Sequence, residues 1–109
     1  MLLNFENSGY NVPEHMWTGI ENYIVHGFLP GSFMEAILCN DFFSAVCRAD
    51  SINSKHLPDI GFWILQNLPG HSYGSPEIIN NWAKDENNIR SDYVKYLKSK
   101  KFHEVMTNE

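Results

Sequence analysis

The chain has 109 residues, of which 43% are hydrophobic, 14% aromatic and 19% charged, and its formal net charge is −5. This length and aromatic content are enough for one packed domain, which excludes a disordered tail. The longest unbroken apolar runs, such as residues 62–65, are far shorter than the roughly 18–20 residues of a membrane span. The first residues also lack the basic and apolar regions of a signal peptide. An excess of acidic residues argues against sequence-independent nucleic-acid binding. Together, these features lead us to expect a small cytoplasmic protein with no membrane or nucleic-acid partner.

Acidic and basic residues are unevenly distributed along the chain. Residues 1–47 contain acids but no Lys or Arg, whereas residues 90–101 hold five of the eight basic residues, namely Arg90, Lys95, Lys98, Lys100 and Lys101. The favoured interpretation is that these cations complement the dipole at the end of a C-terminal helix. The alternative is a basic patch that binds an acidic partner, or the acidic half of a second copy.

The cysteines and histidines do not suggest a metal or redox site. Cys39 and Cys47 would lie too far apart on one helix to form a disulfide, so we expect both to be reduced and buried. No Cys or His spacing is typical of zinc, and no common catalytic or nucleotide-binding loop motif is present. We therefore expect no metal, no cofactor and no enzymatic activity.

The positions of proline and glycine, which favour turns and helix ends, predict an irregular arm over residues 1–12, followed by one helical domain over residues 13–109. Pro13 suits the first turn of a helix, and Gly27 suits the position just after its end. Apolar residues at helical spacing between them predict a first helix over residues 13–26.

The next helix is predicted to be the centre of the fold. Ser32 followed by Glu35 matches a capping box, so the helix should begin at about Phe33 and run to about Ala49. Apolar residues cover nearly every side of this segment, which is typical of a helix packed by neighbours on several faces.

A polar group interrupts that apolar helix, where Asp41, Ser44 and Arg48 share one face. The favoured interpretation is structural: an Asp–Arg pair at a helix crossing, or a break at residues 40–41 in which one residue caps the following helix. The functional alternative is the wall of a polar pocket or a self-associating surface.

Three further helical segments are expected. Residues 51–67 contain Pro58, so either a short turn precedes a helix that starts at this proline or the helix bends there. Ser75 and Pro76 predict the start of a fourth helix that ends near residue 85. A last helix is expected over residues 92–102, with four residues facing inward: Tyr93, Val94, Tyr96 and Leu97. The fold class is therefore all-α, a compact single domain of four to five helices around an apolar central helix.

Two predicted helix starts, at residues 30–32 and 74–76, are rich in glycine and hydroxyl residues. Both are candidate anion sites, because free backbone N–H groups at the start of a helix can bind phosphate. Both are also ordinary helix starts, and that interpretation is favoured for each taken alone. The candidate ligand-binding residues come from these starts, from the polar group and from nearby rings: Gly31, Ser32, Asp41, Arg48, His71, Tyr73, Gly74, Ser75 and Trp82. Most aromatic residues should be core, with Trp17 and Tyr10 the best candidates for a partner surface.

Several short segments together resemble a family of small proteins encoded by phages and prophages. The segments lie between residues 12 and 84 and read Val12-Pro13-Glu14-His15-Met16, Pro30-Gly31-Ser32-Phe33, Asn40-Asp41-Phe42, Arg48-Ala49-Asp50, Asn53 and Gly74-Ser75-Pro76-Glu77. The resemblance implies a phage protein that acts by stoichiometric binding in the host cell. We expect a non-enzymatic counter-defence protein that sequesters a small phosphorylated ligand, such as a nucleotide immune signal, between the subunits of a homo-oligomer. The alternative is an adaptor or inhibitor of a host defence protein that uses the acidic N-terminal face or the basic last helix.

Overall fold

The computed structural model describes the backbone of residues 1–107 and the side chains of residues 1–103, and all of the regular structure in this part of the chain is helical. Its seven α-helices are α1 (Trp17–His26), α2 (Ser32–Leu38), α3 (Phe42–Arg48), α4 (Ser51–Lys55), α5 (Leu57–Asn67), α6 (Pro76–Lys84) and α7 (Ile89–Thr107). Short 3₁₀ turns lie at Glu14–Met16, Gly70–Ser72 and Glu86–Asn88. The all-α prediction is confirmed, but the predicted count of four to five helices is wrong, because two predicted helices are each divided.

The predicted apolar central helix does not exist as one element. It is divided into α2 and α3 at Asn40, which adopts a left-handed conformation with φ 63°, and at Asp41, which caps α3 by accepting a hydrogen bond from the Ser44 N–H at 3.2 Å. The capping-box prediction is also wrong, since Gly31 occupies the cap of α2 and no side chain caps it. Because α3 is short and peripheral, its apolar Phe42 and Phe43 are exposed to solvent, as is Cys47, which was expected to be buried.

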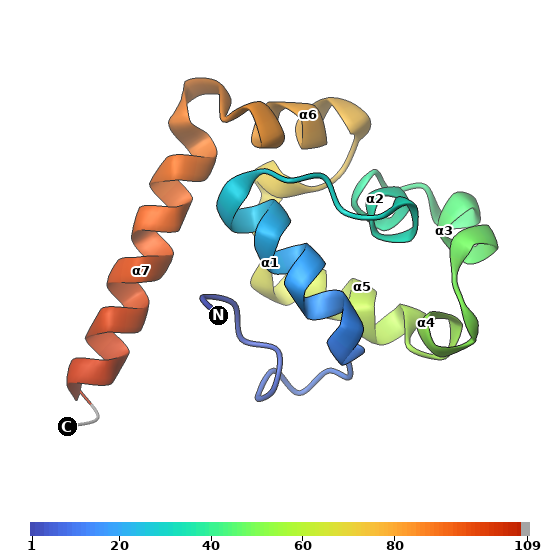
Figure 1. Ribbon diagram of the computed structural model, residues 1–109, viewed down its shortest axis with the longest axis horizontal. Helices are drawn as coiled ribbons and strands as arrows, with labels where there is room; N and C mark the ends of the chain where they lie inside the picture. The colour runs from blue at the N-terminus through green and yellow to red at the C-terminus, as the bar shows by residue number, and fades with distance from the viewer. Residues whose placement is uncertain (108–109) are drawn as a thin grey trace.

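Helix α1 occupies the centre instead. Figure 1 shows it in the middle of the molecule, with α7 on one side and α2, α3 and α4 on the other. Its inward residues Ile20, Tyr23 and Ile24 are essentially inaccessible to solvent. They pack with residues of α5 and α6, among them Ile60, Trp63 and Trp82. The predicted apolar stripe of the first helix is therefore the core of the fold.

The segment around Pro58 follows the first of its two predicted arrangements. α4 is a single short helix that ends at Lys55, and α5 begins at Leu57 with Pro58 in its first turn. Proline is well tolerated there because the N–H that it lacks would have no partner inside the helix. The division separates a peripheral helix from one that contributes Ile60, Trp63 and Ile64 to the core.

The predicted fourth helix agrees with α6, whereas the predicted last helix is shorter than α7. Ser75 caps α6 through the Ile78 N–H at 3.2 Å, and Asp85, in the left-handed conformation, ends the helix. α7 is longer than predicted at both ends and extends away from the body of the molecule (Figure 1). Val94 and Leu97 are buried as expected, but Tyr96 is 56% exposed and not inward-facing.

The N-terminal arm over residues 1–12 has no regular structure, yet it contributes to the core. The ring of Phe5 stacks between those of Trp17 and Trp63, with centroid distances of 5.2 and 4.5 Å. The two tryptophan N–H groups donate to arm carbonyls, Trp17 to Val12 at 2.8 Å and Trp63 to Asn4 at 3.0 Å. Trp17 and Tyr10, the candidates for a partner surface, are half-buried and pack against the core.

We predict that Phe5→Ala lowers the free energy of unfolding by about 3–5 kcal/mol, because it removes a buried ring and leaves a cavity between two indoles. Chemical denaturation with tryptophan fluorescence would measure this loss. Glu6→Ala, at the exposed neighbouring position, is the control and should change stability little. Equal stability of the two variants would show that the arm is not part of the folded core.

Two glycines of the first helical segment should respond in opposite ways to alanine. Gly27 has φ 73°, and a Cβ built there would lie 2.7 Å from the Ala83 carbonyl oxygen, whereas a Cβ on Gly19 meets nothing within 4 Å. We expect Gly27→Ala to lower stability by more than about 1 kcal/mol. Gly19→Ala should raise it by about 0.5–1 kcal/mol, because alanine restricts the unfolded chain. Thermal unfolding of both variants tests the pair, and a loss at Gly19 or a gain at Gly27 would contradict it.

Candidate functional site

The structure distributes the predicted ligand-binding residues over separate places. Gly31, Ser32 and Arg48 line one cavity of about 310 Å³. Asp41, Tyr73 and Gly74 line a mostly apolar groove of about 710 Å³ between α2, α3 and α5. His71 and Trp82 line a small pocket of about 100 Å³ beside α6, and Ser75 lines none of these three.

The loop before α6 offers little to a ligand. The Gly74 N–H donates to the Leu38 carbonyl oxygen at 2.7 Å, and the Ser75 hydroxyl already caps α6. The Trp82 side chain is 1% exposed, and its N–H donates to the Tyr23 carbonyl at 3.2 Å. These groups hold the loop and α6 against α1, so neither the Gly74 N–H nor the Trp82 ring is free to contact a ligand.

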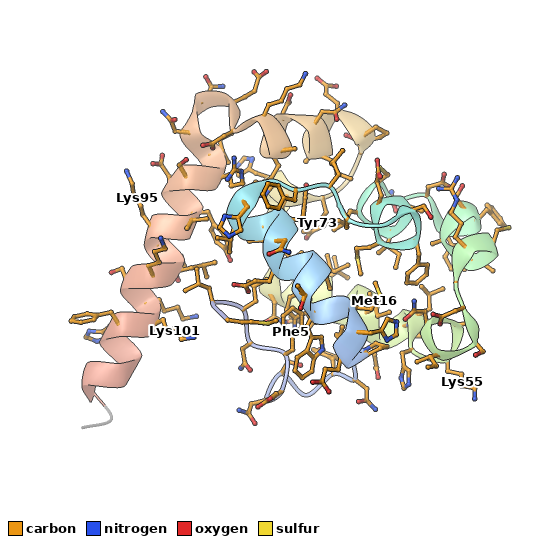
Figure 2. All side chains as sticks on the ribbon, viewed as in Figure 1. Phe5, Met16, Lys55, Tyr73, Lys95 and Lys101 are labelled. Atoms are coloured by element: carbon orange, nitrogen blue, oxygen red, sulfur yellow. The ribbon has the colours of Figure 1, made fainter. Side chains whose placement is uncertain are left out.

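The cavity between α1, α2 and α4 is the strongest candidate site because chemically different groups converge there. Gly31 and Ser32 come from the start of α2, Arg48 from the end of α3 and Asn53 from α4, while His15 comes from the turn before α1. Figure 2 shows Met16, another lining residue, at the end of α1 nearest α4. Short helices that begin and end at one place therefore build the site.

Asp50 contacts two other residues that line this cavity. One carboxylate oxygen of Asp50 accepts a hydrogen bond from the Asn53 backbone N–H at 2.6 Å and so caps α4. The other oxygen lies 3.9 Å from the His15 Nε2 atom, and both side chains are about half exposed. Arg48 lines the same cavity and makes no ion pair with the described residues. The Arg48 side chain is exposed to solvent, and its charge also acts on the Asp41 carboxylate, whose pKa it lowers.

Asn53 is the unusual group of the site. It is 5% exposed, and its Oδ1 atom has no hydrogen-bond partner among the described residues. Its amide nitrogen donates only to the Met16 sulfur at 3.6 Å, and a thioether is a weak acceptor. Buried polar atoms nearly always have a partner, so the unpaired Oδ1 atom sets Asn53 apart from the other residues around this cavity.

Sequence reasoning found Gly31, Ser32 and Arg48 but did not assign His15, Asp50 or Asn53 to a site. A signal for them was present, because each lies in one of the segments that carry the family resemblance. Four of those segments, around residues 15, 31, 48 and 53, meet at this cavity. Their convergence could not be read from the chain because the residues are up to 38 positions apart.

Comparisons with known proteins do not assign the site. No family model, no curated protein and no solved structure matches the chain. Within the described residues, no helix is long and apolar enough to cross a membrane. The same part of the chain holds no cluster of His, Cys, Asp or Glu suited to a metal ion.

The cap of α3 predicts a pH dependence of stability. Hydrogen bonds from the hydroxyl and backbone N–H of Ser44 hold the pKa of Asp41 below its ordinary value, and the charge of Arg48 adds to the effect. Since the folded-state pKa lies below the unfolded one, the Asp41 carboxylate stabilises the folded chain above the unfolded pKa of about 3.9. This stabilisation is lost as the pH falls through the folded pKa.

We therefore expect Asp41→Asn, which keeps a capping oxygen, to melt at a lower temperature than the wild type at neutral pH. The difference should shrink as the pH falls below about 4. Thermal unfolding as a function of pH measures it, with Glu6→Gln in the arm as the control. A difference that stays constant down to strongly acid pH would mean that the carboxylate charge does not stabilise α3.

Proposed function

We propose that the cavity between α1, α2 and α4 binds a small phosphorylated ligand and retains it without chemical change. The observation that carries the proposal is Arg48, a guanidinium group without an ion-pair partner among the described residues, in a cavity that also contains His15. An Arg side chain offers several N–H donors in a planar fork that matches the oxygens of a phosphate. The group is already in place at the end of α3.

Asp50, the acid in this cavity, has other contacts. One of its carboxylate oxygens lies 3.9 Å from the His15 Nε2 atom, and the other accepts a hydrogen bond from the Asn53 N–H. Arg48 forms no ion pair with the described residues. The first-turn N–H groups near Gly31 and Ser32 add donors, but α2 has only seven residues, so we assign the charge contact to Arg48.

The size of the cavity supports a small ligand or part of a larger one. Its volume of about 310 Å³ is at the lower end of the roughly 300–1,000 Å³ of ordinary ligand pockets. A larger ligand would need a second copy of the chain to cover its exposed part. Sequestration of a nucleotide immune signal by a phage-encoded homo-oligomer is the setting that the family resemblance suggests.

An interaction with a host protein is the second candidate function, and the position of the basic residues favours it. Lys95 and Lys101 lie along α7 (Figure 2), on the opposite side of the molecule from α4 and the Arg48 cavity. Lys95, Lys98 and Lys100 are exposed, so these cations are free to contact an acidic partner. This surface does not contribute to the phosphate site.

The ligand proposal predicts a selective gain in thermal stability. The pure protein should be heated with cyclic dinucleotides, cyclic trinucleotides, nucleoside monophosphates and ADP-ribose. A ligand at 100 times its Kd adds about 2.7 kcal/mol, which raises the Tm of a domain this size on the order of 10 °C. Arg48→Ala should weaken binding roughly 10- to 100-fold, because it removes hydrogen bonds to a charged group.

The controls separate the cavity from the rest of the surface. Arg48→Lys keeps the charge but loses the planar fork, so its affinity should lie between those of the wild type and Arg48→Ala. Lys98→Ala, on the remote α7, should leave the ligand-induced shift unchanged. A shift that is equal in Arg48→Ala and the wild type would move the site elsewhere, and no shift with any ligand would favour the protein partner.

The second candidate function predicts salt-sensitive capture of a host protein. Reversal of Lys98, Lys100 and Lys101 to Glu should abolish it, because exposed charges attract over only about 8 Å at physiological ionic strength. Pull-downs at low and high salt with the wild type and the triple variant measure this. Capture that survives the reversal would exclude α7 as the contact.

A further inference from the structure

A face of exposed apolar residues lies on α3 and α5, outside the Arg48 cavity. It consists of five side chains that are between 47% and 81% exposed, namely Phe42, Phe43 and Val46 of α3 and Phe62 and Leu65 of α5. The two helices are neighbours in space, because both line the mostly apolar groove of about 710 Å³. These five residues and the groove are called the α3–α5 face below.

The five side chains form one continuous surface around the groove. Phe42 and Leu65 line the groove themselves. The ring of Phe43 lies edge-on to that of Phe42, with a centroid distance of 5.8 Å, and Val46 follows Phe42 by one helical turn. Phe62 is three positions before Leu65 and so shares its side of α5. The face therefore joins a hollow, the groove, to a projecting ring, Phe43, which is 81% exposed.

The size of this face is close to that of one side of a stable dimer interface. From the usual area of aromatic side chains, the exposed parts of the three phenylalanines present roughly 300–500 Å². The largest apolar patch on a typical monomer covers roughly 300–600 Å² in all. Val46, Leu65 and the groove lining enlarge the face further, toward the roughly 800 Å² that each partner of a standard interface buries.

The composition of the face favours a second copy of the chain as its partner. Among the described residues that line the groove, Asp41 is the only one with a charged side chain. Interfaces with transient partners are about as polar as the rest of a protein surface, whereas homodimer interfaces are more apolar. A small apolar molecule in the groove would leave Phe43 and Phe62 exposed, because neither residue lines it. A second copy covers both of these rings and the groove.

We infer that two copies of the chain associate through the α3–α5 face around a two-fold axis, with Phe43 of each copy in the groove of the other. Such a contact uses the same patch on both subunits and closes at two, so the product is a discrete dimer. The inference goes beyond the proposed ligand site and uses none of the residues assigned to phosphate binding. Either proposal can therefore fail without the other.

Sedimentation equilibrium of the full chain over a wide range of concentrations tests the inference. The wild type should approach twice the mass of one chain as the concentration rises. Phe43→Ser should raise the Kd of the dimer at least roughly 100-fold, because the two-fold axis doubles the loss of a buried ring. Leu65→Ser should act in the same direction. Both residues are exposed in the single chain, so circular dichroism should show an unchanged fold. A wild type that stays monomeric, or association that is unchanged in both variants, would overturn the inference.

Phe102→Ser is the matched control. Phe102 is 67% exposed but belongs to α7, which lies on the opposite side of the molecule from α3 (Figure 1), so its loss should not change association. Salt provides a second control, because it would weaken attraction between the basic α7 and the acidic residues of another copy. Apolar contact between two chains of net charge −5 should persist or strengthen in salt. Dissociation by salt, or by Phe102→Ser, would refute the α3–α5 contact.

The exposed Cys47 gives a readout that does not depend on mass. It lies one turn after Phe43 on the same side of α3, so the dimer should cover it. N-ethylmaleimide should modify Cys47 more slowly at concentrations at which the wild type is a dimer, with peptide mass spectrometry separating this site from Cys39. In Phe43→Ser the rate should not depend on protein concentration. Equal rates for dilute and concentrated wild type would exclude α3 from the contact.

Discussion

The buried position of Tyr23 is the constraint on which the rest of the structure depends. Its ring is inaccessible to solvent, and its hydroxyl donates to the Ser72 carbonyl at 2.7 Å. Burial raises the pKa of Tyr23 far above its ordinary value, so the hydroxyl keeps its proton and remains a donor. The carbonyl of the same residue accepts from the Trp82 indole at 3.2 Å. One residue of α1 thus holds both the loop before α6 and α6 itself.

The end of α1 is fixed in a related way. Arg90, at the start of α7, donates to the Val25 carbonyl at 3.0 Å and to the Trp82 carbonyl at 3.1 Å. A guanidinium group is well suited to the carbonyls at helix ends. Arg90 therefore belongs to the fold, and among the basic residues of α7 it is the exposed lysines that remain available to a partner. The opposite end of α1 carries the turn with His15 and so forms a wall of the candidate site.

The candidate site results from breaks between short helices more than from any one helix. Arg48 ends α3, Asp50 caps α4, and Gly31 precedes α2. Each of these residues has a local role that any helix end requires, since caps and terminal charges compensate unpaired backbone groups. What distinguishes the cavity is that these ends line it together with His15 and the buried Asn53.

Local signals in the sequence determined several elements by themselves. Ser75 with Pro76, Gly27 after α1, and the inward stripe of Ile20, Tyr23 and Ile24 specify helix ends and a buried face through nearest-neighbour chemistry. Only the tertiary structure decided which helix is central. Residues 33–49 are apolar on nearly every side, yet the left-handed Asn40 and the Asp41 cap divide them and leave Phe42 and Phe43 exposed. The candidate site also depends on the tertiary structure. Arg48 could be proposed from its charge alone. Its position in one cavity with His15 and Asn53 depends on contacts between residues far apart in the chain, which no local pattern contains.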